Sequence, residues 1–389
     1  ALLEDCGSRM GASALGVKKS VARGQTATGW SPRGRPWCVC GLNGGGRVAY
    51  IPRGMALFLV TGGCGFIGSN LAHSLVQRGH QVRLLDDLSS GRLSHVEPLL
   101  AGPAPRAELV RGDVGDAALL DRALVGVDFV LHHAAVPSVP WSVERPLDCQ
   151  RINVDGTLQL LEAVRRAKRV QRLVFAASCS AYGDLSPEKP KRETDPVSPQ
   201  SPYAAAKLAS EHLCTAYQHS YGVPTVALRY FNIFGPRQDP ATLYAAVIPR
   251  FVTAALQGKP ATIYGDGGQT RDFCFVDNVV QANLLACQAP IEQVGGQVFN
   301  IGCGEATSLL QLQALIAELL SAQAGRTPPP VRFEPARAGE VRHSRADIGK
   351  ARELLGYVPQ VSLRQGLEQT LVWARAQLES AKGSAPCAA

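Results

Sequence analysis

Residues 61–68 read TGGCGFIG, and this stretch decides the fold class of the chain. It follows a short apolar run and precedes SNLAHSLVQRG, which has the composition of a helix. Glycines at a strand-to-helix turn let the backbone bend sharply and approach a phosphate closely. The helix N-terminus beyond the turn offers unpaired N–H groups and the positive end of a dipole. The spacing of Gly62, Gly65 and Gly68 therefore predicts a dinucleotide-binding turn.

A second predicted strand, QVRLLD at 81–86, ends in an acidic residue about 20 residues after the turn, as dinucleotide-binding folds require. The Asp86 carboxylate can accept hydrogen bonds from the 2′- and 3′-hydroxyls of a ribose, and it would repel a 2′-phosphate. NAD is therefore predicted in preference to NADP. Asp113, which ends a third predicted strand, either reaches the adenine or forms a turn, and both interpretations stay open.

Short apolar runs alternate with helical stretches after Met55, and most of the runs are apolar throughout. Strands that are buried on both faces belong to parallel sheets covered by helices. The predicted fold class is therefore α/β, with a Rossmann-type doubly wound parallel sheet and a smaller mixed α/β C-terminal domain. Strands are predicted at 56–62, 81–86, 107–113, 128–134, 172–178 and 225–232.

Gly- and Pro-rich connections interrupt this alternation beyond residue 233. We therefore predict an NAD-binding domain and a second ligand-binding domain, with the ligands in the cleft between them. The predicted NAD-binding domain is 55–232, with 276–302 packing back on it. The second domain is 233–275 together with 303–375, and a C-terminal tail follows at 376–389.

The net charge of +8 is unevenly distributed along the 389 residues. Residues 1–54 hold eight Lys/Arg and two Asp/Glu, a net charge of +6, which leaves +2 for the rest. No basic stripe with interleaved aromatic residues remains, so no nucleic-acid partner is predicted. No apolar run reaches the roughly 18 residues that a membrane span requires, so no membrane insertion is predicted.

The eleven cysteines are scattered without regular spacing, and no secretory signal pattern precedes them. This pattern predicts a cytoplasmic location. The close pair Cys38 and Cys40 lacks a second ligand pair, so no metal site is predicted. Residues 1–54 lack periodicity and are predicted to be an unstructured or non-native extension. A flexible tail and a transit peptide stay open as alternatives.

Tyr203 and Lys207 lie four residues apart in SPYAAAKLASEH, at the start of a predicted helix. Residues at this spacing share one helix face. A cationic lysine and a bound nicotinamide cation would both favour the phenolate, lowering the pKa of Tyr203 toward neutrality. The pair therefore predicts that Tyr203 is a general base.

With this pair, the chain resembles the extended short-chain dehydrogenase/reductases, and among them the nucleotide-sugar 4-epimerases that act on UDP-N-acetylglucosamine. The resemblance extends from Met55 to about residue 375. The motifs that carry it are TGGCGFIG, HHAAVPSV, NVDGT, AASCSAYGD, PYAAAK, LRYFNIFGPRQDP, YAAVIP, GDGGQTRDFCFVDN and RAGEVRHSRAD.

The resemblance implies a catalytic set of Ser178, Tyr203 and Lys207. Tyr203 takes the proton of the sugar 4-hydroxyl while C4 gives hydride to a tightly bound NAD. The 4-keto sugar then turns over, and hydride returns to the opposite face. Relatives that eliminate water or carbon dioxide carry acidic residues directly after the position of Ser178. Cys179 and Ser180 stand there in this chain, so epimerisation is predicted.

The resemblance also implies two sets of binding residues. The remaining cofactor-binding residues are Phe66, Ile67, Ser90, Gly91, Val114, Ala134, Ala135, Asn153 and Tyr230, which join Tyr203 and Lys207. The substrate-binding residues are Ser138, Cys179, Ser180, Asn232, Ala246, Val247, Arg271, Arg337 and Ser344.

Two small residues bear on the choice of sugar. In the family that the chain resembles, the residue seven positions after the anchoring Arg337 walls the sugar pocket, and a small residue there admits a 2-N-acetyl group. That residue is Ser344, and Ala246 points the same way. The predicted substrate is UDP-N-acetylglucosamine, interconverted with UDP-N-acetylgalactosamine. UDP-glucose or UDP-glucuronate epimerisation and, more remotely, a non-catalytic binding protein stay open. The resemblance also implies a homodimer that pairs the helix beginning near Tyr203.

Overall fold

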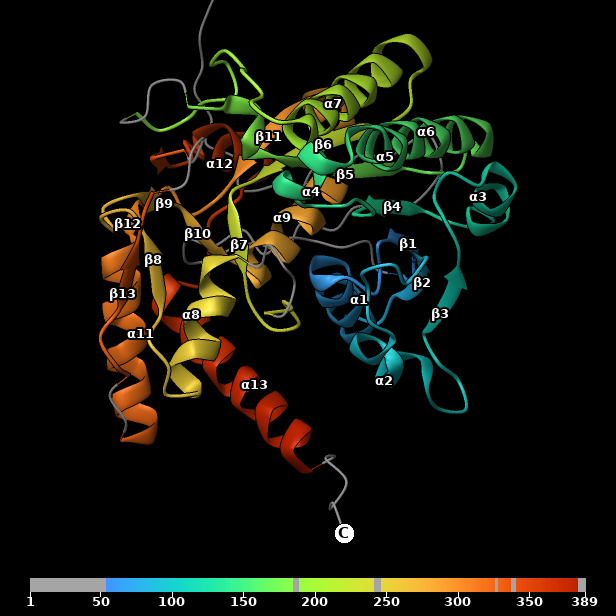
Figure 1. Cartoon of the computed structure of the whole chain (residues 1–389). Helices are drawn as coiled ribbons and strands as arrows, with labels where there is room; N and C mark the ends of the chain where they lie inside the picture. The colour runs from blue at the N-terminus through green and yellow to red at the C-terminus, as the bar shows by residue number, and fades with distance from the viewer. Residues whose placement is uncertain (1–53, 185–188, 241–245, 326–327, 337–340, 384–389) are drawn as a thin grey trace, which may run out of the picture. The chain divides into compact units, whose positions relative to one another are not determined.

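The computed structural model describes residues 54–184, 189–240, 246–325, 328–336 and 341–383 (Figure 1). All of them belong to one compact unit, which comprises residues 49–389. The predictions for the N-terminal extension before residue 54, for Cys38 and Cys40 and for Arg337 lie outside the described residues.

A seven-stranded parallel sheet forms the centre of the fold, in the order β11-β6-β5-β4-β1-β2-β3. This order, with helices on both faces, is the Rossmann arrangement, which confirms the predicted fold class. Six of the strands coincide with predicted runs to within a few residues. The strands are β1 Leu57–Thr61, β2 Gln81–Asp86, β3 Ala107–Arg111, β4 Phe129–His132, β5 Arg172–Ser178, β6 Thr225–Tyr230 and β11 Val298–Ile301.

Each strand of the sheet buries alternate side chains against opposite helical layers, as a period of two residues requires. In β1, Phe58 and Val60 pack with α1 and α9, whereas Leu59 packs with α3, α6 and α7. The helices on the first side are α1 Phe66–Gln77 and α9 Val276–Gln288. Those on the second are α3 Ala117–Ala123, α6 Gly156–Ala167 and α7 Pro202–Tyr221, as Figure 1 shows.

The strand order creates a crevice for a ligand beyond the carboxyl ends of the neighbouring strands β1 and β4. The chain runs outward from β1 to β2 and β3, then returns to β4 on the other side of β1. Helices that follow these two strands diverge, so the carboxyl ends of β1 and β4 border a crevice. The short helices of the chain are α2 Glu97–Leu100, α4 Val139–Glu144, α5 Pro146–Gln150, α10 Ile291–Val294 and α12 Gly349–Leu355.

A separate hydrophobic core lies in the C-terminal half, where Phe251, Ile263, Leu312 and Leu371 are buried together. It is built by helices α8 Val247–Leu256, α11 Leu309–Ala324 and α13 Leu363–Gly383. The small strands here are β7 Asn232–Phe234, β8 Thr262–Tyr264, β9 Thr270–Arg271, β10 Phe273–Phe275, β12 Thr307–Ser308, β13 Arg332–Glu334 and β14 His343–Ser344.

Helix α13 continues through residue 376, where the sequence predicted the beginning of a tail. Its buried residues Leu367, Leu371 and Ala374 follow a helical spacing and pack the first part of the helix into this core. Among the described residues, no helix combines the length and the apolar character that crossing a membrane would demand.

Candidate active site

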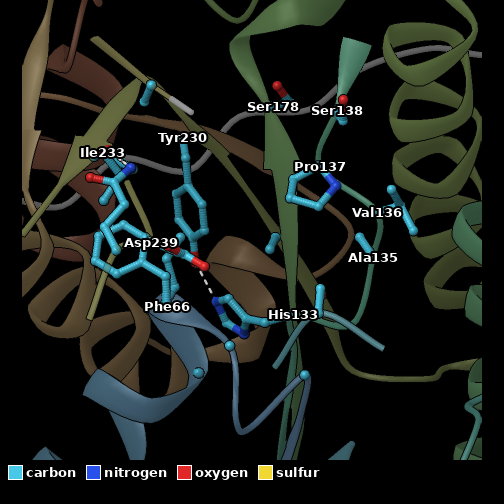
Figure 2. Close-up of a pocket in the computed structure, with 18 of the residues that line it drawn as sticks. Phe66, His133, Ala135, Val136, Pro137, Ser138, Ser178, Tyr230, Ile233 and Asp239 are labelled. Carbon is cyan, nitrogen blue, oxygen red and sulfur yellow. Dashed lines mark hydrogen bonds between the residues drawn. The ribbon is translucent and has the colours of Figure 1, made fainter. Parts of the chain in front are cut away.

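A cavity of about 800 Å³ lies at the carboxyl ends of the central strands and is lined by residues from both halves of the chain (Figure 2). It brings together most of the predicted site residues. These are Gly62, Gly65, Phe66, Ile67, Gly68, Asp86, Ser90, Gly91, Asp113, Val114, Ala134, Ala135, Ser138, Ser178, Cys179, Tyr203, Lys207, Tyr230, Asn232, Ala246, Val247 and Arg271.

Three predicted binding residues lie behind the cavity wall instead of lining it. Asn153 is buried and accepts a hydrogen bond from the Val136 N–H at 2.9 Å, so it supports the loop that follows β4. Ser180 donates to Ser178 and does not face the cavity. Ser344 hydrogen-bonds the Cys179 thiol, and only the cysteine reaches the cavity.

The glycine turn between β1 and α1 closes on itself so tightly that side chains are excluded. Gly62 has a φ of 65°, and a Cβ atom added to Gly68 would lie 2.1 Å from the Gly62 carbonyl oxygen. The N-cap of helix α1 is Gly65, which provides no side-chain cap, and the first turn holds no acidic residue. Its N–H groups are thus available to an anion, which fits a dinucleotide diphosphate.

The Asp86 carboxylate is held at the end of β2 by two backbone donors. Its oxygens accept hydrogen bonds from the Cys64 N–H at 2.9 Å and the Leu88 N–H at 2.8 Å. Burial raises the pKa of Asp86, and the two donors oppose that shift. A Cβ atom on Gly91 would meet the carboxylate at 2.7 Å, so glycine is needed for this approach. Each oxygen keeps a second lone pair for a ribose hydroxyl.

Asp113 combines the two interpretations that the sequence left open. It lines the cavity, and its Oδ1 atom accepts a hydrogen bond from the Gly115 N–H at 2.8 Å, as in an Asx turn.

Ser178 and Tyr203 meet at the end of β5. Tyr203 is the second residue of α7, whose start is set by Pro202 and by the Ser201 hydroxyl, which accepts from the Ala204 N–H at 3.1 Å. The side chains of Tyr203 and Ser178 are hydrogen-bonded to each other. Ser178 Oγ also accepts from the Ser180 hydroxyl at 2.9 Å. Ser178 can therefore direct its own proton at the Tyr203 oxygen.

Lys207 lies one helical turn after Tyr203 and is buried. Its Nζ donates to the Ala176 carbonyl oxygen at 2.8 Å and sits 4.8 Å from the centre of the Phe175 ring. Burial lowers the pKa of Lys207 to about 8, so it is mostly a cation at neutral pH. The hydrogen bond to the Ala176 carbonyl therefore holds the positive charge of Lys207 near Tyr203 in the first turns of α7.

In the protein without cofactor, the Tyr203 hydroxyl is a weaker acid than a free tyrosine. Burial raises the pKa of Tyr203 to about 12, and the hydrogen bond from Ser178 offsets only part of that shift. The prediction had Lys207 and a nicotinamide cation lowering this pKa together. The cost of burying a charged phenolate raises the pKa of Tyr203 more than the neighbouring Ser178 lowers it. Tyr203 is therefore protonated in the protein without cofactor.

The opposite wall of the cavity carries polar groups suited to a second ligand. Asn232 Nδ2 is buried and has no hydrogen-bond partner among the described residues, although Asn232 borders the cavity. Arg271 also borders it, and its Nη1 donates to the Thr270 and Arg342 carbonyl oxygens at 2.9 and 3.1 Å. An amide donor and a guanidinium on one wall fit an anionic, hydroxyl-rich ligand.

His133 was not predicted as a site residue, although it lies in the HHAAVPSV motif. Its Nε2 atom is 2.9 Å from the Tyr230 hydroxyl, which also accepts from Asn283 Nδ2 at 2.8 Å. Figure 2 shows the His133 and Tyr230 rings joined by this hydrogen bond. Burial lowers the pKa of His133 to about 3, so the ring is neutral and positions Tyr230. No local spacing links residues that are this far apart in sequence.

The cavity combines a dinucleotide turn with a Ser-Tyr-Lys set, and the comparison with known proteins agrees with it. A family model described as "NAD dependent epimerase/dehydratase family" matches residues 58–302. The chain belongs to this family. NAD is accordingly its cofactor, and the predicted class of NAD-dependent nucleotide-sugar epimerases is confirmed at the level of the enzyme family.

Similar members of the family are named for several sugars. A UDP-glucose 4-epimerase of Mycolicibacterium smegmatis is 40% identical over 318 residues, covering 82% of this chain and 98% of its own length. A solved UDP-N-acetylglucosamine 4-epimerase of Methanobrevibacter ruminantium, in complex with UDP-N-acetylmuramic acid, is 35% identical with a TM-score of 0.76, covering 83% and 99%. A Bacillus cereus UDP-glucuronic acid 4-epimerase, in complex with UDP-glucuronic acid and NAD, is 33% identical with a TM-score of 0.73, again covering 83% and 99%.

Proposed function

We propose that the protein interconverts UDP-N-acetylglucosamine and UDP-N-acetylgalactosamine by inverting C4 through a 4-keto sugar. The observation that carries this proposal is that Ser178, Tyr203 and Lys207 line the same cavity, with Cys179 and Ser180 directly after Ser178. Neither a thiol nor a hydroxyl replaces the carboxylic acids that elimination of water requires, so oxidation and re-reduction at one carbon is the chemistry favoured.

NAD, when bound, supplies a positively charged hydride acceptor that can return the hydride to the sugar. The chain's own groups manage the proton. Tyr203 holds it in the protein alone. With NAD bound, the nicotinamide cation and Lys207 would favour loss of this proton to solvent, and we infer that the resulting phenolate Oη accepts the proton of the sugar 4-hydroxyl as hydride leaves C4. Ser178, which accepts from Ser180, donates to the Tyr203 oxygen and stabilises the phenolate. The Lys207 cation adds to that stabilisation.

The proposed anchors for the UDP diphosphate and sugar lie on the wall opposite the glycine turn. Arg271 offers a guanidinium and Asn232 an unpaired amide donor. Arg337 is proposed with them from the sequence alone. A ligand held at its diphosphate leaves the sugar free to present either face to the cofactor, which epimerisation requires.

The preference for an N-acetylated sugar rests on two small residues near the cavity. Ser344 pairs with Arg271 in the register of β14 and β9, and it supports Cys179 in the wall. Ala246 lines the cavity at the start of α8. Small side chains here leave space for a 2-N-acetyl group. UDP-glucuronate remains the second candidate, because the Bacillus cereus relative is named for that substrate.

The test is a panel of UDP-sugars incubated with purified protein in the absence of added NAD. We expect NMR to show UDP-N-acetylgalactosamine forming from UDP-N-acetylglucosamine faster than the 4-epimers of UDP-glucose and UDP-glucuronate form. Absence of conversion of every UDP-sugar would overturn the proposed activity. Preferred conversion of UDP-glucuronate would overturn the substrate assignment alone.

Ser344→Tyr tests the reason for the preference. The ring would push Cys179 toward the cavity and close the space for the N-acetyl group, so we expect loss of UDP-N-acetylglucosamine turnover with UDP-glucose turnover retained. His343→Tyr is the matched control, because the neighbouring side chain on β14 contacts Thr270 instead. Equal losses on both sugars in Ser344→Tyr would refute the pocket argument.

A further inference from the structure

Residues 235–239, which follow β7, border the cofactor side of the cavity through Arg237, Gln238 and Asp239. They come from FGPRQDP, a motif to which sequence analysis assigned no binding residue. Figure 2 shows Asp239 and Phe66, the first residue of α1, on the same cavity. The segment therefore lies next to the helix whose N-terminus faces the diphosphate.

The first attachment of this segment is to helix α1. Arg237 donates from Nη2 to Asn70 Oδ1, and Asn70 Nδ2 donates to the Pro236 carbonyl oxygen at 3.1 Å. Asn70 is buried in the second turn of α1. Two hydrogen bonds with opposite donors thus fix the segment to the dinucleotide helix.

The second attachment reaches the loop after β2. Arg92 and Asp239 form an ion pair between residues 147 positions apart in sequence, and both line the cavity. Arg92 follows Ser90 and Gly91, which border the predicted ribose site beside Asp86. The side chains are 54% and 23% exposed, so solvent reaches the pair and it can open.

Arg237 adopts a backbone conformation that residues with a side chain rarely take, with a φ of 69°. Such a conformation persists when surrounding contacts hold it. The Arg237 Nε atom is also buried without a partner among the described residues. Both features fit a segment kept in a set position beside an anionic ligand.

We propose that residues 235–239 form a strap that retains NAD in its cleft, with the Arg92–Asp239 ion pair as its releasable end. The α1 attachment is the permanent end, because its two hydrogen bonds share the buried Asn70 side chain. The proposal rests on NAD as the cofactor and does not depend on which sugar nucleotide is turned over.

The direction in which one substitution changes the rate of NAD release distinguishes the strap from a simple electrostatic attraction between the protein and NAD. Asp239→Asn removes a negative charge near an anionic cofactor, which by Coulomb attraction alone would slow the loss of NAD. The strap predicts the opposite, because opening the ion pair frees the loop. An exposed ion pair of this kind corresponds to a release rate that increases about threefold to fivefold.

The experiment measures how fast NAD leaves the full-length protein during dialysis into NAD-free buffer, with the retained nucleotide quantified by chromatography. No UDP-sugar is present, so the result is independent of the proposed activity. We expect faster loss from Asp239→Asn and Arg92→Ala, and no further increase in the double variant, since one interaction accounts for both.

Asp121→Asn is the matched control, because Asp121 forms a similarly exposed pair with Arg166 away from the cavity. It should lose NAD at the wild-type rate. Slower or unchanged loss from Asp239→Asn would overturn the strap. Additive effects of the two substitutions would overturn the pairing. Thermal unfolding of each variant with saturating NAD verifies the fold, and Asp239→Ser, which also removes the negative charge, decides the outcome if Asp239→Asn does not fold.

Discussion

On the cofactor side of the cavity, the glycine turn and Asp86 come from one short stretch of chain, whereas the opposite side is assembled from distant segments. Gly62 and Gly68 are in close contact within a single turn. Asp86 accepts a hydrogen bond from the N–H of Cys64, which lies only 22 positions away. The opposite wall instead places Asn232 beside β10 and pairs Arg271 with Ser344 in parallel strands.

A single carboxylate organises the assembled side. Asp272 is fully buried and accepts hydrogen bonds from the Cys303, Gly304 and Ala346 N–H groups at 2.7, 2.9 and 3.0 Å. It thereby joins the strand of Arg271 to the loop after β11 and to the chain just beyond Ser344. The difference teaches that steric exclusion shapes the cofactor side, while a buried polar network shapes the other.

Tyr203→Phe should give the largest effect, because Tyr203 lies where the two sides meet. Removal of the hydroxyl deletes the proton acceptor, and we expect kcat for UDP-sugar epimerisation to fall by about 100- to 10,000-fold. NAD should still co-purify, since the glycine turn is untouched. Tyr221→Phe, at an exposed tyrosine on the same helix, is the control. Retention of substantial turnover in Tyr203→Phe would remove Tyr203 from the catalytic set.

Gly68→Ala would test steric exclusion on the cofactor side. The added methyl would lie 2.1 Å from a backbone oxygen, so the turn must open. We expect the free energy of unfolding to fall by about 1 to 3 kcal/mol or more, with loss of bound NAD. Denaturant titration and nucleotide quantification measure the two effects.

Gly65→Ala provides the graded comparison, because its methyl would lie at 3.2 Å from the same oxygen. Its effect should be smaller than that of Gly68→Ala. Equal effects would contradict the steric explanation of the turn.

Asp272→Asn should give a smaller change, confined to the assembled side. An amide presents a donor to one of the three N–H groups, so the strand of Arg271 loses its fixed position. We expect KM for the UDP-sugar to rise about tenfold, a change of about 1.4 kcal/mol, with NAD content retained. Asp266→Asn, at an exposed carboxylate in the preceding loop, should leave KM near the wild-type value. Loss of NAD from Asp272→Asn would contradict the conclusion that Asp272 organises only the side of the cavity opposite the cofactor.

The same residue gives a pH test. Burial raises the pKa of Asp272 from 3.8 to about 6, so the folded protein binds this proton more tightly than the unfolded chain. The resulting stabilisation is present below about pH 4 and is lost as pH rises through about 6. The free energy of unfolding of wild type relative to Asp272→Asn should therefore decrease across that window. An increase would mean that the hydrogen bonds outweigh burial.

Sequence reasoning succeeded where the physical constraint is local. The apolar runs located the strands, and the glycine spacing located the cofactor turn. It placed Ser180 and Ser344 at the substrate, and in the structure they contact Ser178 and Cys179, which line the cavity. It missed His133 because its partner Tyr230 lies 97 positions away. Whether a side chain faces the cavity depends on residues that are distant in sequence, and the spacing of a motif does not show those contacts.

By itself, the sequence determined the parallel sheet, the glycine turn after β1 and the shared helix face of Tyr203 and Lys207, because strand burial, glycine sterics and a four-residue helical spacing act over short distances. Only the tertiary structure decided that burial keeps Tyr203 protonated in the protein alone, that Asp272 joins three segments, and that Arg92 meets Asp239 across the cofactor cavity. These properties arise from desolvation and from contacts between residues far apart in the chain, and they exist only once the chain has folded.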